Sequence, residues 1–305
     1  MGNLFKAFFF KIRKDISFRI TCFIGLGFSI LIPLIFFLID LGISFIDGNG
    51  GPIEHNFATG QSLLVSSWSP TQNFGLAIPI NLITFTVAEF SAGTIRNKII
   101  SGYSKTKIYL GLYFTGLVYT LALISTYVLI CFGLGCAFGG FNPNGNIFSA
   151  TSMSGGQITP EFIWKIIVLS LLAYTVIASM TIFFASLFRI IGPTIPVVII
   201  LIIACSFMGT IAQVLMLFND GEDATTVSQI MTGVGKFLKA VNPLHSLLIY
   251  DTKVTIVNPE PEVYDYVTTV GISWSSFWTE VANNLVYIAA FFTGGLLLFR
   301  KRDVK

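Results

Sequence analysis

Long apolar runs separated by short polar stretches dominate the pattern of this sequence. An α-helix needs about 20 residues to cross a hydrocarbon core about 30 Å thick, so runs near that length are candidate membrane spans. Six runs qualify, at residues 20–39, 74–88, 108–138, 163–188, 190–218 and 281–299. The second is short and partly polar, and Pro193 and Pro196 near the start of the fifth predict a kink rather than a break. The pattern predicts an all-α integral membrane protein with six transmembrane helices.

The first 19 residues predict a separate amphipathic helix on the cytoplasmic membrane surface. Their apolar residues recur at helical spacing, with basic residues between them. The apolar set is Leu4, Phe5, Phe8, Phe9, Ile12 and Ile16, and the basic set is Lys6, Lys11, Arg13 and Lys14. The run that follows is too long for a signal peptide, and no small-residue cleavage site comes after it. A basic tail that serves only to set the topology is the alternative.

Composition indicates a membrane protein, and the charge and motifs argue against nucleic-acid binding and catalysis. The chain of 305 residues is 54% hydrophobic and 11% charged, with a mean hydropathy of +0.80. A net charge of +3 without a continuous basic stripe does not indicate a nucleic-acid partner. No phosphate-binding loop, serine elbow or HExxH motif is present, so the sequence shows no catalytic chemistry of its own. The cysteines lack metal-ligand spacing and are expected to act as small hydrophobic residues; they are Cys22, Cys131, Cys136 and Cys205.

The distribution of charge predicts the orientation of the chain. With a cytoplasmic N-terminus, 14 of the 18 lysines and arginines fall inside, as the positive-inside rule requires. Twelve of the 15 acidic residues then fall outside, where they would attract cationic peptides. The tryptophans lie near predicted outer ends of spans, as in an aromatic belt; they are Trp68, Trp164, Trp274 and Trp278. Both termini are therefore expected in the cytoplasm.

Three long outer segments separate the predicted spans, at residues 40–73, 139–162 and 219–280. The first two are rich in Gly, Asn, Ser and Pro, which predicts loops with short helical pieces. In the third, apolar residues recur at helical spacing from Val227 to Val241, and the apolar stretch NPLHSLLIY at 242–250 follows. Both stretches are too short to cross, so we expect a helical or re-entrant segment at the interface or in the outer leaflet before the last span. A structural cap and a role in substrate release both remain open for it.

A polar island at residues 89–107 interrupts the apolar pattern between the second and third runs. It is longer and more regular than a simple turn of the chain requires. Its apolar residues, which would hold it against the ends of the spans, are Ile95, Ile99, Ile100 and Tyr103. Its basic residues Arg96 and Lys98 would point elsewhere. Gly102 offers a stop signal. The island predicts a short amphipathic helix at 93–103 on the cytoplasmic surface, where a soluble partner could press on it.

At this island the chain resembles the permeases of ABC-2 type transporters. In that pattern an acidic residue ends the second span, a Gly-Thr pair follows, and a basic helical turn leads to Gly-x-Ser-basic. The matching residues are Glu89, Gly93, Thr94, Arg96, Asn97, Lys98, Gly102, Ser104 and Lys105. The six-span layout, the N-terminal helix and the outer segment before the last span are similar too. The resemblance therefore covers nearly the whole chain.

The resemblance implies the transmembrane subunit of an ATP-binding cassette exporter in a bacterial plasma membrane. The ATPase would be a separate chain that binds ATP and Mg²⁺, and a second permease copy would complete the path as a homodimer. Residues 93–103 would be the coupling helix, with Arg96 and Lys98 contacting the ATPase and Glu89 anchoring the helix. The long outer segments are similar to the peptide-export and lantibiotic or bacitracin-resistance branches. Apolar spans with few charge partners suit a hydrophobic or cationic amphipathic cargo, such as a peptide, an antibiotic or a lipid-like molecule.

Two other classes of protein stay open. A secondary transporter or channel without an ATPase partner would carry ionisable groups inside its spans. Here the span interiors are expected to be nearly uncharged, with Glu89 and Lys165 at their edges and Lys165 able to snorkel to the surface. An intramembrane enzyme or a scaffold is the third class, and an enzyme would need a convergent set of polar groups in the spans.

Overall fold

The computed structural model describes residues 2–46, 58–67, 77–141, 157–158, 160–217, 226–244, 251–260 and 263–301. The helices are α1 (Gly2–Lys14), α2 (Ile16–Ile46), α3 (Gly60–Ser67), α4 (Ala77–Ser91), α5 (Thr94–Ile100), α6 (Lys105–Gly139), α7 (Pro160–Phe188), α8 (Ile191–Leu217), α9 (Thr226–Val241) and α10 (Trp274–Lys301). The strands are β1 (Gln157–Ile158), β2 (Asp251–Glu260) and β3 (Val263–Gly271). Trp68 of the predicted aromatic belt lies outside the described residues.

Five of these helices, α2, α6, α7, α8 and α10, are long and apolar enough to cross a membrane. Helices α4 and α5 pass the same test together, but the chain bends by 55° between them. The long apolar helices indicate a multi-pass membrane protein. Each of the six predicted runs overlaps a described helix, the second run overlapping α4, whereas a six-span topology stays a prediction.

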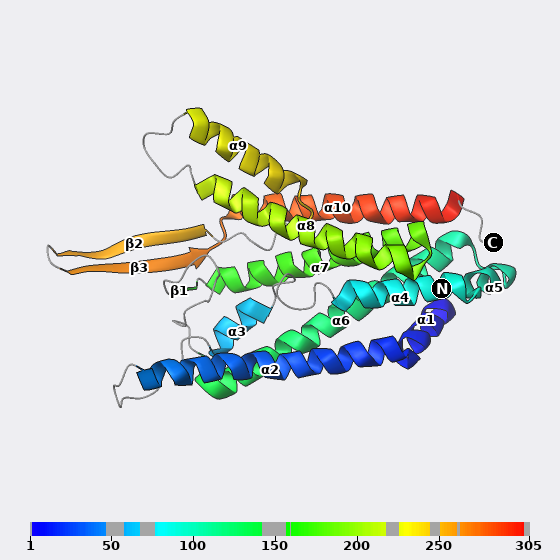
Figure 1. Ribbon diagram of the computed structural model, residues 1–305, viewed down its shortest axis with the longest axis horizontal. Coiled ribbons are helices and arrows are strands. Elements are labelled where there is room, and N and C mark those ends of the chain that lie inside the picture. Colours follow the sequence, from blue (N-terminus) through cyan, green and yellow to red (C-terminus); the bar gives the residue numbers. More distant parts are fainter. Residues whose placement is uncertain are drawn as a thin grey trace.

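The long helices run side by side along the long axis of the molecule (Figure 1). Helix α7 lies between the others and packs against α4, α6, α8 and α10. Both ends of the described chain lie at one end of the bundle, together with α1 and α5. Helix α3, helix α9 and the β2–β3 hairpin lie toward the opposite end.

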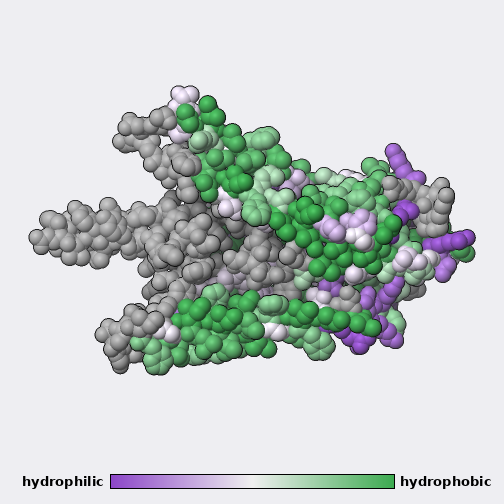
Figure 2. Space-filling model, in the orientation of Figure 1, coloured by the Kyte–Doolittle hydropathy of each residue, from purple (hydrophilic) through white to green (hydrophobic). Residues whose placement is uncertain are grey.

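Charge and apolar surface separate clearly along the bundle. Figure 2 shows hydrophilic side chains gathered at the end that carries α5, which we refer to as the basic end. Its basic residues come from α1, α5, the start of α6 and the end of α10; they are Lys6, Lys11, Arg13, Lys14, Arg96, Lys98, Lys105, Lys107, Arg300 and Lys301. The sides of α2 and α8 expose large apolar residues such as Phe23 and Phe207. This distribution suits helices whose sides contact lipid and whose ends contact water.

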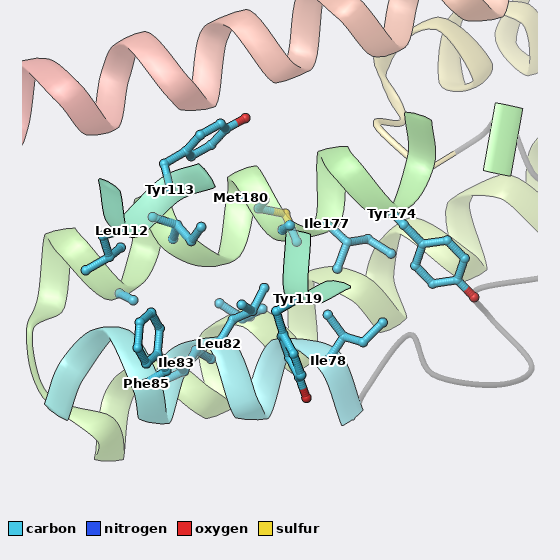
Figure 3. Packing of buried hydrophobic residues seen from close by; sticks show 14 of the residues in the cluster. Ile78, Leu82, Ile83, Phe85, Leu112, Tyr113, Tyr119, Tyr174, Ile177 and Met180 are labelled. Carbon is cyan, nitrogen blue, oxygen red and sulfur yellow. The ribbon is translucent and has the colours of Figure 1, made fainter. Parts of the chain in front are cut away.

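The buried core fills the space between α4, α6 and α7 (Figure 3). Leu82 of α4, Leu112 of α6 and Met180 of α7 are almost completely buried within it. Gly116 of α6 allows the three helices to approach closely, because a Cβ atom at this position would lie 3.0 Å from Ile182 Cδ1 and 3.2 Å from Leu82 Cδ2. A larger residue at 116 would push α6 away from its neighbours.

A three-stranded sheet in the order β1-β3-β2 adds to the helical fold expected from the sequence. Strands β2 and β3 pair antiparallel, with an irregularity between Ile256 and Asn258, and β1 pairs parallel to β3. All three strands fall in predicted outer segments. The β-branched and aromatic residues of VYDYVTTV, at 263–270, carry a strand signal that the helical pattern of 227–241 overshadowed. Residues 245–250 of the predicted apolar element lie outside the described residues.

The few charged residues within the long helices lie close to the helix ends, in keeping with the expectation of nearly uncharged interiors. Helix α2 extends well beyond the predicted end of the first run, and buried Asp40 accepts a hydrogen bond from Ala58 N at 2.8 Å. Lys165 does not snorkel, because its side chain is only 3% exposed. Its ammonium donates to Ile272 O at 2.8 Å and lies 4.2 Å from the centroid of the Trp274 ring. The helices are longer than the apolar runs, which brings flanking polar residues inside them.

Helix α9 lies against α8 and leaves its apolar face exposed. Thr232 is buried toward the protein, whereas the large apolar residues are exposed: Val227, Ile230, Met231, Val234, Phe237 and Val241. The C-terminal end of α9 is fixed from both sides, since Tyr287 of α10 donates to Val241 O at 2.8 Å and Asn242 donates to Cys205 O of α8 at 2.7 Å. Cys205 and Tyr287 lie near the midpoints of their helices. The position of α9 relative to the bilayer, at the interface or dipping into the outer leaflet, stays a prediction.

Candidate functional site

The polar island folds into a bend between α4 and α5 at the basic end. Helix α4 ends at Ser91, and Gly93 follows with a φ of 64°, a left-handed conformation that glycine adopts without steric cost. Asn97 N then donates to Gly93 O at 3.1 Å and opens α5. The bend places α5 at the tip of the bundle (Figure 1).

Glu89, within the last turn of α4, is the centre of the site. Its side chain is fully buried, and its carboxylate accepts three hydrogen bonds from side chains. Lys11 Nζ of α1 lies 2.7 Å from Oε1, whereas Lys98 Nζ and Thr94 Oγ1 of α5 lie 2.6 Å and 2.7 Å from Oε2. We refer to these four side chains as the Glu89 joint. One carboxylate thus connects α1, α4 and α5.

Helix α1 packs against the bundle through a buried apolar stripe. Leu4, Phe8 and Ile12, spaced one turn apart, belong to the main hydrophobic core. Helix α1 contacts α2 and α6, and Phe8 packs against Phe85 of α4, whereas the location of α1 at the membrane surface stays a prediction. Phe9 and Phe10 remain exposed on the outer side of α1.

The Phe8 ring extends the Glu89 joint into α6. Lys98 Nζ lies 3.5 Å from the centroid of this ring, within the range of a cation–π contact. Gly111 of α6 makes room for the ring, because a Cβ atom there would lie 2.9 Å from Phe8 Cε2. Phe8 is therefore held between α5 and α6.

Two lysines share one carboxylate, so the Glu89 joint carries one formal positive charge in excess. Removing one partner of a buried ion pair typically costs about 3–5 kcal/mol, whereas an intact pair contributes much less net stability. The side chains of Lys11 and Lys98 are 36% and 19% exposed, so water reaches part of the joint. The arrangement fixes geometry more than it stabilises the fold.

Ile100 lies on the exposed face of α5, whereas the sequence predicted it on the apolar face that contacts the spans. Ile95 is fully buried and Ile99 packs against the core, but Ile100 is 74% exposed. Helical residues are about 100° apart, so Ile99 lies close to the face of Ile95 whereas Ile100 turns well away from it. Arg96, Asn97 and Ile100 form the exposed face of α5.

Lys98 has a different position from the one expected for an ATPase contact. Its ammonium points inward, to the Glu89 carboxylate and the Phe8 ring. Arg96 is the basic residue of α5 that points outward, and within the described ranges it forms no ion pair. A partner protein would therefore contact Arg96 first, whereas Lys98 acts from inside the joint.

The chain leaves α5 through a defined turn. Gly102 has a φ of 88°, and Tyr103 N donates to Lys98 O at 3.1 Å, a C-terminal capping arrangement that needs a left-handed residue. Ser104 caps the first turn of α6 with its side chain. Lys105 donates to a backbone carbonyl at the end of α10 at 3.3 Å. These contacts fix both ends of α5.

Sequence reasoning missed the partners of the site that come from distant segments. Lys11 and Glu89 are 78 positions apart, and no local pattern pairs them. Arg189, at the α7–α8 connection, has a φ of 58° and places its guanidinium carbon 5.1 Å from the centroid of the Phe90 ring. The one signal for the contact between Lys11 and Glu89 was that Lys11, three positions after Phe8, lies on the same side of α1 as this apolar residue.

The site consists of a short exposed helix whose inward side chains are hydrogen-bonded to the bundle. The predicted residues from Glu89 to Lys105 run from the last turn of α4, through the bend, α5 and the following turn, to the first residue of α6. The exposed atoms are those of a short basic helix, and the buried ones tie it to the bundle. No family model, no curated protein and no solved structure matches this chain.

Proposed function

We propose that this chain is the transmembrane subunit of an ATP-binding cassette exporter of the ABC-2 type. The single observation that carries the proposal is α5, a short helix whose outward face is exposed and whose inward face is bound to the Glu89 joint. A helix that transmits force must be rigid relative to the spans it moves. The resemblance of residues 89–105 to the coupling segment of these permeases adds a second, independent argument.

The contacts suggest how motion of α5 would reach the spans. Glu89 links α5 to α4, and Lys11 with Phe8 links it to α1, which leads directly into α2. The capped turn at Gly102 leads into α6. A push on α5 would therefore tilt three neighbouring helices together, because each connection is short and hydrogen-bonded.

The remaining components of the proposed exporter are outside this chain. The ATPase subunit would bind ATP and Mg²⁺ and receive Arg96 in a groove, and a second permease copy would complete the path. The cargo would be a hydrophobic or cationic amphipathic molecule such as a peptide, an antibiotic or a lipid-like compound. The exposed apolar sides of the helices fit a location in the cell membrane.

A charge reversal at Arg96 tests the proposal. Losing a charged contact at an interface and replacing it with a repulsive one typically weakens binding by well over tenfold. We expect Arg96→Glu to insert and fold normally, yet to lose the co-purifying, vanadate-sensitive ATPase activity that the wild-type chain retains. Lys107→Glu is the matched control, because Lys107 is also exposed at the basic end but lies outside α5.

Reversing both basic residues, in Arg96→Glu with Lys98→Glu, would test more than the outward contact. Glutamate at 98 would face the Glu89 carboxylate, so the double variant would also break the joint. A correctly inserted Arg96→Glu variant that keeps the ATPase and transports as usual would contradict the coupling-helix assignment. It would favour the alternative, a secondary transporter or channel without an ATPase partner.

A further inference from the structure

A groove between α2 and α6 contains a cavity that the Glu89 joint does not use. Its volume is about 290 Å³, the space of roughly ten liquid waters. One face of each helix lines it, including Phe18, Gly25 and Ser29 of α2 and Tyr119, Ala122 and Tyr127 of α6. Small residues face each other across the gap, which explains why the two helices leave a space between them.

The groove opens sideways, toward the outer surface of the bundle. Leu26 and Ala122 at its rim are exposed, whereas Gly25, Ser29 and Tyr119 are buried in its floor. Around the rim α2 exposes an apolar surface of the kind that contacts lipid; its residues include Phe23, Ile24, Phe28 and Leu31. Hydrocarbon from the bilayer therefore has direct access to the groove.

Tyr119 supplies a buried polar group at one end of this apolar cavity. It is 5% exposed, and its hydroxyl has no hydrogen-bond partner among the described residues. Its ring packs against Phe18 with the centroids 5.0 Å apart, and in Figure 3 its hydroxyl points away from Ile177 and Met180. A buried hydroxyl is costly to leave unpaired, and a small rotation of the Tyr119 ring would let it donate to an acceptor that a bound molecule brings to this end of the cavity.

The Tyr119 end of the groove lies beside the elbow between α1 and α2. Lys14 and Arg19 are exposed at this elbow, where Arg19 donates to Lys14 O at 3.0 Å. Asp15 lies at the same elbow and has interactions within the protein. The groove therefore has a basic, hydrated end and an apolar interior that runs toward Tyr127. These two parts match the charged head group and one hydrocarbon chain of an amphiphilic molecule.

From these features we propose that the α2–α6 groove binds one acyl chain of an anionic phospholipid from the leaflet at the basic end. The ester carbonyl accepts a hydrogen bond from Tyr119, the phosphate lies near Arg19 and Lys14, and the chain extends toward Tyr127. This binding site does not depend on the proposed export function.

Lipid retention by the purified chain tests the site. The protein is reconstituted in vesicles of equal parts phosphatidylglycerol and phosphatidylcholine, extracted in mild detergent and examined by native mass spectrometry. We expect about one retained phosphatidylglycerol per chain, and at least a tenfold lower occupancy for Ala122→Phe, whose ring fills the cavity. Leu129→Phe is the matched control, because Leu129 lies on the same helix and is 68% exposed. It is expected to retain lipid as the wild type does.

Two further variants address the polar end. Tyr119→Phe keeps the ring and the cavity but removes the hydroxyl, so we expect about fivefold weaker retention. Arg19→Gln is expected to reduce phosphatidylglycerol retention to the level of phosphatidylcholine. Because Tyr119→Phe preserves shape, it keeps the test decisive if Ala122→Phe fails to accumulate.

Lipid-dependent stability separates a specific site from the general lipid shell. Adding phosphatidylglycerol to delipidated protein should raise the Tm of the wild type and of Leu129→Phe, but not that of Ala122→Phe. Equal retention by wild type, Ala122→Phe and Tyr119→Phe would overturn the proposal. So would a change of oligomeric state in Ala122→Phe without any change in lipid retention, because a second copy of the chain would then occupy the groove.

Discussion

The carboxylate of Glu89 connects three elements, and removing its charge tests that connection at the scale of one residue. In Glu89→Gln the side chain keeps its shape, but Lys11 and Lys98 lose their counter-charge. Because both lysines are partly exposed, we expect a loss of about 2 kcal/mol in the free energy of unfolding, below the range for fully buried pairs. Thermal unfolding in detergent measures it. Lys107→Gln is the control, since Lys107 is exposed and forms no salt bridge within the described ranges, so the change should alter stability little.

The same position can separate stability from coupling. If the chain is the proposed exporter subunit, Glu89→Gln is expected to keep the ATPase bound while hydrolysis continues without transport, because α5 is no longer fixed at its start. Adding Lys98→Met to this variant removes one unpaired ammonium, so stability should partly recover while transport does not. Recovery of both together would show that Glu89 serves the fold alone.

Gly111 tests how α1 is attached. A leucine there would place atoms where the Phe8 ring now lies, since even a Cβ atom would be 2.9 Å from Phe8 Cε2. We expect Gly111→Leu to displace α1 and expose Lys6 and Lys11 to trypsin, with a cleavage rate at least tenfold above wild type. Gly133→Leu on the same helix is the control, because nothing lies within 4 Å of a Cβ atom there. Adding Phe8→Ala should restore much of the protection, and persistent cleavage would argue against this packing.

At the scale of an element, the C-terminal end of α9 has its backbone carbonyls and Lys239 paired with side chains of α10. Tyr287 satisfies the carbonyl of Val241, and buried Glu280 of α10 lies 3.9 Å from the ammonium of Lys239. These contacts accept the backbone and charge that a helix end brings with it. The exposed apolar face of α9 is then free to contact acyl chains.

Spin labels can determine where α9 lies. In a cysteine-free background, a nitroxide at Ile230 or Val234 should show high accessibility to oxygen and low accessibility to a polar nickel reagent, because both face outward from the bundle. A label at Ser275, exposed at the start of α10, should show the opposite and is the control. Water-like accessibility at Ile230 and Val234 would place α9 outside the bilayer.

The sequence predicted elements well where apolar runs were long and poorly where contacts between distant segments decide the structure. Helix α7 begins and ends within a few residues of its predicted run, because hydropathy alone specifies it. The length of α2 was underestimated, since Asp40 is compatible with a helix once Ala58 supplies a hydrogen bond. Helix α5 was predicted from its local pattern, but the inward direction of Lys98 depends on α1 and could not be predicted.

At the scale of the whole molecule, the gathering of basic residues at one end predicts a single orientation. We expect Lys107→Cys and Lys301→Cys to react with a membrane-impermeant maleimide only in inverted vesicles, and Ser275→Cys only in intact cells. The three positions lie at the start of α6, the end of α10 and the start of α10. The reverse pattern would invert the topology, and labelling of Lys107→Cys and Lys301→Cys from opposite sides would contradict the arrangement of the bundle.

The attachment of α1 has a consequence for biosynthesis. The residues that receive Phe8 and Lys11 are made long after them, since Glu89, Lys98 and Gly111 all come later in the chain. At a translation rate of about 5–20 residues per second, roughly 5–20 s pass before the residues that contact α1 have been synthesised. During this interval its phenylalanines have no protein partner, and the membrane surface is the nearest apolar environment. The amphipathic pattern of the first residues would then serve the nascent chain first, as an interfacial anchor, and the mature fold second.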